Sequence, residues 1–208
     1  DCLRGRLDME HLSLTLAGVE DHLSVFTQAK RIVIVACGTS WHAGLVAEYM
    51  IETLCRIPVE VEYASEFRYR NPVIGPGDVI IAISQSGETA DTLVAIERAK
   101  EQGAFIFGVV NAVGSSIARL SHSGAYTHAG PEIGVASTKA FTAQLTVLAM
   151  MAMKIGKEKG TLSAEEYNRY LAELAQIPSK VEKTLATHEQ VKAVAAHCAG
   201  ARDFLFLG

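Results

Sequence analysis

Short apolar runs bounded by turn residues recur along the first two thirds of the chain. Three of these runs are continuous and rich in β-branched residues, which is typical of strands buried on both faces of a parallel sheet. They cover residues 31–37, 78–84 and 104–111. Residues 58–63 instead alternate apolar residues with glutamates, which indicates a strand nearer the sheet edge, and residues 124–128 are a shorter fifth candidate.

Helical patterns separate these strands. Residues 45–54 place apolar side chains four positions apart and stop before Pro58. Residues 89–102 carry an apolar face and end at Gly103, a natural helix cap. Alternating strands and helices with short connections predict parallel pairing and right-handed crossovers. We therefore expect an α/β fold, a three-layer α/β/α sandwich with a five-stranded parallel sheet in the flavodoxin-like order 2-1-3-4-5.

The last third of the chain is helical in pattern. Residues 137–153 are apolar nearly all round, which predicts a helix buried against several partners or in a homodimer interface. A capping box over residues 163–166 predicts the start of another helix. Its apolar stripe consists of Tyr167, Leu171, Leu174, Ile177, Val181 and Leu185. A further helix is expected over residues 189–198, and residues 203–208 begin like another strand.

These patterns predict the domain organisation of the 208 residues. We expect residues 1–30 to form a helical lead-in, 31–160 the α/β domain, and 161–202 a helical connector. Residues 203–208 would then be the first strand of a second, truncated domain of the same kind. The expectation is a piece of a longer protein.

Composition narrows the function. The net charge of -4 and the absence of a basic run argue against a nucleic-acid partner. The longest apolar run, residues 140–153, is shorter than the roughly 20 residues a membrane helix needs. The four cysteines follow no disulfide or metal-ligand spacing. We expect reduced thiols in a cytoplasmic protein, with no metal, no cofactor and no membrane contact.

Two loops rich in hydroxyl side chains follow the first and third predicted strands, counted along the chain. They are Cys37–Ser40 and Ser84–Thr89. The free amides and dipole at a helix N-terminus, joined by hydroxyl donors, suit a phosphate group. In the order 2-1-3-4-5 both loops border the crevice where ligands bind. The candidate phosphate residues are Thr39, Ser40, Ser84, Ser86 and Thr89.

Serine and threonine also cap helices, and that is the alternative interpretation of these loops. One cap needs one hydroxyl, whereas Ser84–Thr89 contains three. Neither loop carries Lys or Arg, and the chain has no dinucleotide or P-loop motif. The pattern therefore favours a single phosphate monoester over a nucleotide.

Other residues with charged, aromatic or titratable side chains are expected to have structural roles. Glu88 is expected to complement a helix dipole, and His42 has no identifiable nucleophile or carboxylate partner. Trp41 is expected to pack, and residues 68–70 to be solvated or in an interface. The glycine and small residues of segment 132–139 permit close approach to a ligand, and Ser137 could cap the apolar helix, but the residue types alone assign no role there.

Four segments together resemble the bacterial glucosamine-6-phosphate synthase family, in the first of its two sugar isomerase (SIS) domains. They are residues 37–40, 64–70, 84–93 and 132–141. The resemblance runs from Leu12 to Gly208. Segment 84–93 by itself indicates only the SIS fold, whereas 64–70 and 132–141 are more particular to the synthase.

The resemblance implies a function and a set of site residues. The family makes glucosamine 6-phosphate and glutamate from fructose 6-phosphate and glutamine, as a homodimer with an N-terminal glutaminase domain. The matching substrate-binding positions are Thr39, Ser40, Ser84, Gln85, Ser86, Thr89, Val135 through its carbonyl, and Ser137. The family's acid–base groups lie in the second SIS domain, so no catalytic residue is expected here. Cys2 lacks the motif around the family's glutaminase nucleophile.

Two alternatives stay open. A stand-alone SIS sugar-phosphate isomerase would need its own base and would not end in an unfinished strand. A non-enzymatic SIS sensor, as in transcription regulators, should bring a helix-turn-helix, and residues 1–30 are too acidic and too short for one. For the leading interpretation we expect this chain to bind a hexose 6-phosphate without converting it.

Overall fold

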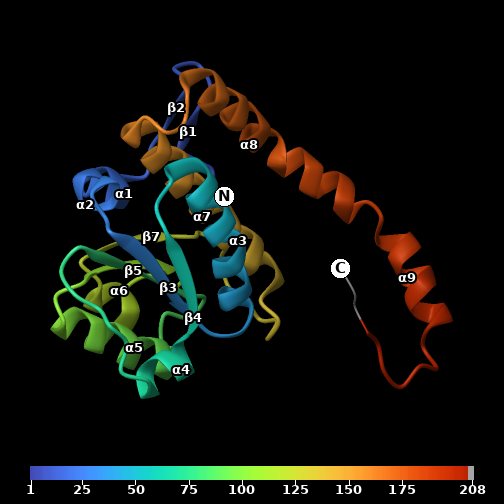
Figure 1. Cartoon of the computed structure of the whole chain (residues 1–208). Helices are drawn as coiled ribbons and strands as arrows, with labels where there is room; N and C mark the ends of the chain where they lie inside the picture. The colour runs from blue at the N-terminus through green and yellow to red at the C-terminus, as the bar shows by residue number, and fades with distance from the viewer. Residues whose placement is uncertain (206–208) are drawn as a thin grey trace. The chain divides into compact units, whose positions relative to one another are not determined.

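Five parallel strands form the central sheet of the computed structural model, which describes residues 1–205 (Figure 1). The strands are β3 (Arg31–Ala36), β4 (Val59–Tyr63), β5 (Asp78–Ser84), β6 (Phe105–Val110) and β7 (Ser123–Tyr126). Their spatial order is β4-β3-β5-β6-β7. Within the sheet this is 2-1-3-4-5, so the predicted flavodoxin-like order and the α/β class are confirmed.

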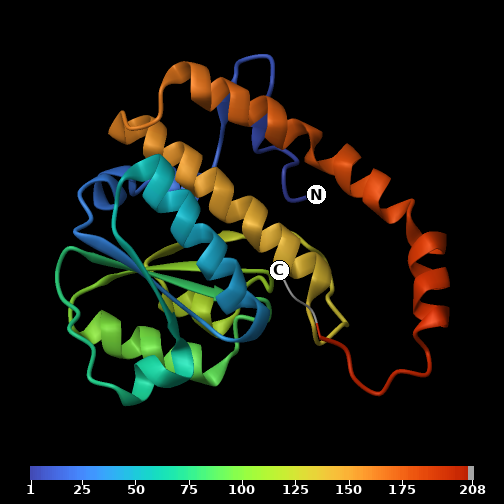
Figure 2. The same ribbon diagram turned by 45° about the vertical axis from the view of Figure 1, so that its right-hand side comes forward.

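Helices cover both faces of this sheet. One face carries α3 (Gly38–Cys55) and α7 (Thr138–Lys159), and the other carries α4 (Ala64–Tyr69), α5 (Ala90–Glu101) and α6 (Ser116–Leu120) (Figure 2). Every residue of β5 is buried, because both of its faces are covered. The strand β4 lies at a sheet edge, as its sequence predicts. Val59 is buried and Glu60 exposed, but the alternation does not continue, because Tyr63 is exposed.

The apolar helix predicted over residues 137–153 is buried as expected. Its residues Val147, Leu148 and Met151 have no exposed surface. It contacts α3 along its length, and it also contacts the N-terminal helices α1 (Ala17–Glu20) and α2 (Leu23–Thr27). The burial is therefore supplied by this chain itself.

The N-terminal segment contains more than helices. Two very short strands, β1 (Leu7–Asp8) and β2 (Ser13–Leu14), pair in antiparallel fashion before α1 and α2. Phe26 of α2 is fully buried and packs edge-on against Phe107 of β6, with ring centroids 5.3 Å apart. The segment thus completes the core on the α7 face of the sheet.

The chain divides into two compact units, Asp1–Leu171 and Ala172–Gly208. The helix α8 (Ala164–Leu185) crosses this division, and α9 (His188–His197) follows it. The predicted capping box is confirmed, because Ser163 Oγ accepts from the Glu166 amide at 3.2 Å and the Glu166 carboxylate accepts from the Ser163 amide at 3.3 Å.

The apolar stripe of α8 changes along its length. Tyr167, Leu171 and Leu174 are buried, whereas Ile177, Val181 and Leu185 are exposed. Residues 203–205 form no strand, and the rest of the predicted strand 203–208 lies outside the described residues. The boundaries 1–30, 31–160, 161–202 and 203–208 stay a prediction. In the part of the chain that the structure describes, no helix has the length and apolar character needed to cross a membrane.

Candidate functional site

The two hydroxyl-rich loops leave the same edge of the sheet from neighbouring strands. β3 and β5 pair directly, with Ala36 opposite Ile83, so Cys37–Ser40 and Ser84–Thr89 both begin at their carboxyl ends. The helix after β3 crosses one face of the sheet and the helix after β5 crosses the other. The topological switch point of the sheet, where ligands of such folds bind, therefore lies between the two candidate loops.

Hydroxyl groups brace the loop after β5 from within. Ser84 Oγ lies 3.0 Å from Thr89 Oγ1 and accepts a hydrogen bond from the Gly87 amide at 3.0 Å. Ser86 Oγ accepts from the Glu88 amide at 3.2 Å. Ser84 is buried, whereas Ser86 is exposed to solvent. The loop is thus held in shape while one of its hydroxyls faces solvent.

The capping interpretation of these hydroxyls does not account for the loop. Thr89 stands at the N-cap position of α5, yet its hydroxyl makes no capping hydrogen bond. Cys37 holds the same position before α3 and makes none either. The first amides of both helices are left to other acceptors, and an anion is the acceptor such amides favour.

Gly87 allows a tight contact at the centre of the loop. Its φ is +66°, and a Cβ there would lie 2.0 Å from the hydroxyl of Ser115. Its carbonyl accepts from the amide of Ile117 at 2.9 Å. Ser115 is buried, and its hydroxyl has no hydrogen-bond partner. Only glycine fits this position, because any side chain would collide with Ser115.

Glu88 complements a helix N-terminus, but the helix is α6 and not α5. Its carboxylate accepts from the amide of Ser116, the first residue of α6, at 2.8 Å. The hydrogen bonds from Ser116, followed by the nearby charge of Arg119, lower the pKa of the Glu88 carboxyl. Glu88 is therefore held ionised and turned to α6, which is the wrong state for an acid and a poor placement for a base.

The loop after β3 is tied to α7. The buried amide of Gln144 donates to Ser40 Oγ at 3.0 Å. Thr39, one position earlier, is partly exposed. Gln144 is a residue that the sequence analysis missed, although a glutamine inside an apolar helix is itself a signal of a buried polar contact.

The third candidate segment reaches the same edge. α3 and α7 run side by side from that edge, as the contacts Ser40–Gln144 and Cys55 Sγ to Ala152 O show (Figure 2). The loop before α7, with Val135 and Ser137, therefore lies next to the start of α3. Val135 is fully exposed.

The prediction that the Ser137 side chain caps α7 is wrong. Ser137 occupies the N-cap position with a φ of +56°, and its hydroxyl makes no capping hydrogen bond. Glu132 replaces it, because its carboxylate accepts from the amide of Ala140 at 2.9 Å. The left-handed backbone of Ser137 turns its side chain away from the cap geometry.

The remaining candidate residues are structural. The rings of Trp41 and Tyr63 stack with centroids 4.1 Å apart, so Trp41 packs as expected. Arg68 pairs with Asp91 at 2.6 Å, and Arg70 pairs with Glu62. These ion pairs fit the expectation of a solvated cluster rather than an anion site.

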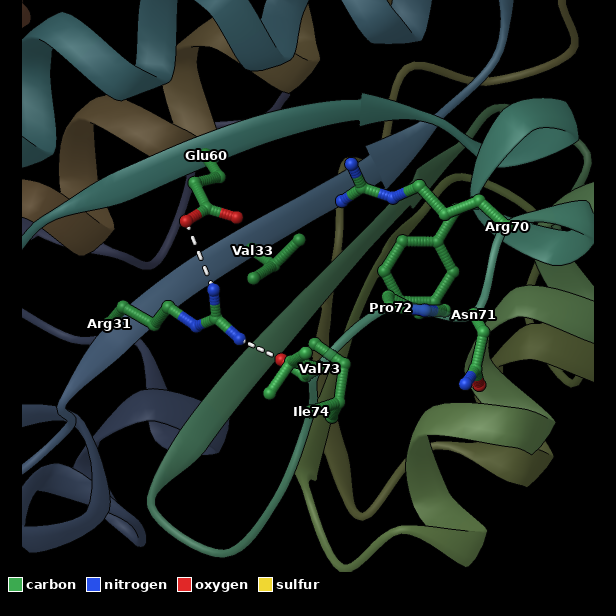
Figure 3. Close-up of a pocket in the computed structure, with 9 residues that line it drawn as sticks. Arg31, Val33, Glu60, Arg70, Asn71, Pro72, Val73 and Ile74 are labelled. Carbon is green, nitrogen blue, oxygen red and sulfur yellow. Dashed lines mark hydrogen bonds and ion pairs between the residues drawn. The ribbon is translucent and has the colours of Figure 1, made fainter.

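A cavity of about 380 Å³ lies elsewhere, lined by residues of β3 and β4 and by residues of the segment 67–74 (Figure 3). Arg31 points into it and pairs with Glu60 at 3.0 Å and Asp78 at 3.3 Å. The positive charge of Arg31 is thus paired within the protein. None of the candidate site residues lines this cavity. Among residues 1–205, no group of three or more His, Cys, Asp or Glu is placed to hold a metal ion.

Comparison with known proteins gives the class. The sequence pattern of the SIS domain matches residues 25–154, and the chain belongs to this family. It is similar over all of its 208 residues to the glutamine–fructose-6-phosphate aminotransferase (isomerizing) of Bacteroides thetaiotaomicron at 55% identity, and to that of Chlorobaculum tepidum at 56%. It spans 34% of the length of each.

A solved structure agrees with these relatives. The C-terminal domain of glucosamine-fructose-6-phosphate aminotransferase from Francisella tularensis matches with a TM-score of 0.82 and 41% identity. The match covers 86% of this chain and 50% of that chain. The resemblance drawn from the four sequence segments is thereby confirmed: the chain is a SIS domain similar to part of these enzymes.

Proposed function

We propose that this chain is the fructose 6-phosphate-binding SIS domain of a glutamine–fructose-6-phosphate aminotransferase. The observation that carries the proposal is the loop Ser84–Thr89, whose hydroxyls brace it without capping α5. It lies at the switch point of the sheet, where ligands of this fold class bind. The relatives' names supply the sugar phosphate.

The proposed binding roles follow the loops. Ser84, Gln85, Ser86 and Thr89 hold the phosphate, with the first amides of α5 as further donors. Thr39 and Ser40 close the opposite side of the phosphate. The carbonyl of Val135 and the hydroxyl of Ser137 meet the sugar hydroxyls, and fructose 6-phosphate and glucosamine 6-phosphate are the ligands.

The chain by itself is proposed to bind without turning over. Moving a proton between two sugar carbons needs a placed base with a matched pKa, and Glu88 is occupied at α6. The aminotransferase activity belongs to the whole enzyme, which we propose to be a cytoplasmic homodimer.

Calorimetry with fructose 6-phosphate tests this proposal. A hydrogen bond to a charged group contributes roughly 1.5–3 kcal/mol, so Ser86→Ala or Thr89→Ala should weaken binding about ten- to a hundredfold. Ser179→Ala, which removes an exposed hydroxyl from α8, is the matched control and should leave the affinity unchanged. Equal binding by all variants would place the phosphate elsewhere.

An isomerase assay on the same sample separates the alternatives. The proposed domain gives no glucose 6-phosphate from fructose 6-phosphate. Appreciable conversion would mean that a base lies within these 208 residues, and would favour the stand-alone isomerase.

A further inference from the structure

Asn111 joins two parts of the candidate site that are far apart in sequence. It is the first residue after β6. Its main-chain amide donates to the carbonyl of Gln85 at 3.2 Å, and the next amide, of Ala112, donates to the same carbonyl at 3.3 Å. The end of β6 is therefore attached to the phosphate loop through the backbone alone.

The side chain of Asn111 makes a different set of contacts. Its Oδ1 accepts from the hydroxyl of Thr127 at 3.0 Å and from the amide of Ala129 at 2.8 Å. Its Nδ2 donates to the carbonyl of Gly130 at 2.8 Å. An amide side chain offers an acceptor and a donor on separate atoms, and the partners themselves determine which end is oxygen.

These partners control the direction of the chain after the last strand. β7 ends at Tyr126, and the segment that follows has no regular structure before α7 begins. His128 and Gly130 both adopt positive φ, at 51° and 71°. Because this segment forms no regular backbone hydrogen-bond pattern, its direction depends on side-chain hydrogen bonds such as those of Asn111. It leads directly into the loop that carries Val135 and Ser137.

The phosphate loop does not need this side chain. Ser84 braces it from within, Glu88 ties it to α6, and Gln85 is held by backbone amides. We propose that Asn111 is a positioning residue that sets the Val135–Ser137 loop against the phosphate loop, and so gives the site its preference for a sugar phosphate over bare phosphate. The inference rests on the proposed function.

The test compares two ligands on the 208-residue chain, fructose 6-phosphate and inorganic phosphate, by calorimetry. Asn111→Ala should lower the affinity for fructose 6-phosphate about tenfold, which corresponds to ~1.4 kcal/mol. Its affinity for inorganic phosphate should stay within about twofold, because hydrogen bonds removed from one loop leave the independently braced loop unchanged. Asn71→Ala, which truncates an exposed asparagine after α4, is the matched control and should change neither affinity.

Two further measurements keep the test valid if the alanine variant folds poorly. Thr127→Val keeps the shape of a buried side chain and removes one donor to Asn111, so it should lower the preference for the sugar phosphate by a smaller factor. Hydrogen exchange on Asn111→Ala should speed up at Ala129, which loses its acceptor, and at Ser137, whose amide donates to the carbonyl of Gly134, while residues 84–89 keep their protection.

The outcomes distinguish the two proposals. A wild-type chain that binds neither ligand overturns the proposed function and this inference with it. A wild-type chain that prefers fructose 6-phosphate, with Asn111→Ala and Thr127→Val retaining that preference, overturns this inference alone. An equal loss of affinity for both ligands in Asn111→Ala also overturns this inference alone, because the side chain would then support the phosphate loop as well.

Discussion

Gly87 and Gly38 both adopt positive φ beside the candidate site, but their surroundings differ. A Cβ on Gly87 would lie 2.0 Å from Ser115 Oγ and 2.5 Å from Ser115 Cβ. A Cβ on Gly38 would meet nothing within 4 Å. The first glycine is needed for space and conformation, whereas the second is needed for conformation only.

This difference predicts unequal costs for the same substitution. Gly38→Ala should lower the free energy of unfolding by about 1–2 kcal/mol, the cost of a left-handed residue that carries a Cβ. Gly87→Ala should lower the free energy of unfolding by the same amount and by about 1–3 kcal/mol more, because its Cβ would also overpack against Ser115. Urea denaturation of both variants measures the two costs. Equal losses would mean that Ser115 moves aside freely.

At the scale of elements, the pair α3 and α7 positions two of the three candidate loops. Gln144 joins α7 to Ser40, and Cys55 Sγ donates to the carbonyl of Ala152 near the other end. The helices approach closely at Gly156, where a Cβ would lie 2.6 Å from the carbonyl of Leu54. The two helices are therefore in contact near both ends, and the candidate loops precede their N-terminal ends.

Gly156→Ala sets two effects against each other. Alanine in a helix interior is favoured over glycine by about 1 kcal/mol, but overpacking against rigid backbone costs about 1–3 kcal/mol. We expect the clash to exceed the gain in propensity, because the atom that is met is a backbone carbonyl and not a flexible side chain. The measured melting temperature should fall, and a rise would show that the helices can separate at little cost.

At the scale of the whole molecule, every candidate site residue lies in the unit Asp1–Leu171. The stripe of α8 is buried as far as Leu174 and exposed from Ile177 onward. The residues after Leu174 contribute no candidate ligand to the site.

A chain ending at Leu174 should therefore bind fructose 6-phosphate as the 208-residue chain does, within about twofold, since its binding groups are unchanged. A chain ending at residue 166 lacks the buried Tyr167 and Leu171, and should unfold at a lower temperature. Calorimetry and thermal melts of both chains are the measurements. Loss of binding in the longer of the two would assign part of the site to residues 175–208.

Local patterns in the sequence were sufficient for most of the architecture. The runs that became β3, β5 and β6 are continuous and apolar because both faces of the sheet are covered. The capping box of α8 was predictable because its two partners are three residues apart. The pair of short strands β1 and β2 was missed, because two residues are too few to show an alternation.

The hydroxyl loops could also be found from the sequence, because their residues are neighbours and the strand order brings both to one edge. Their binding roles stay a prediction. Tertiary structure alone decided the partners of polar groups: Glu88 with α6, Glu132 with α7, and Gln144 with Ser40. The physical reason is range. Periodicity and turn chemistry act over a few residues, whereas a buried amide or carboxylate takes its partner from whatever segment the packed sheet brings beside it.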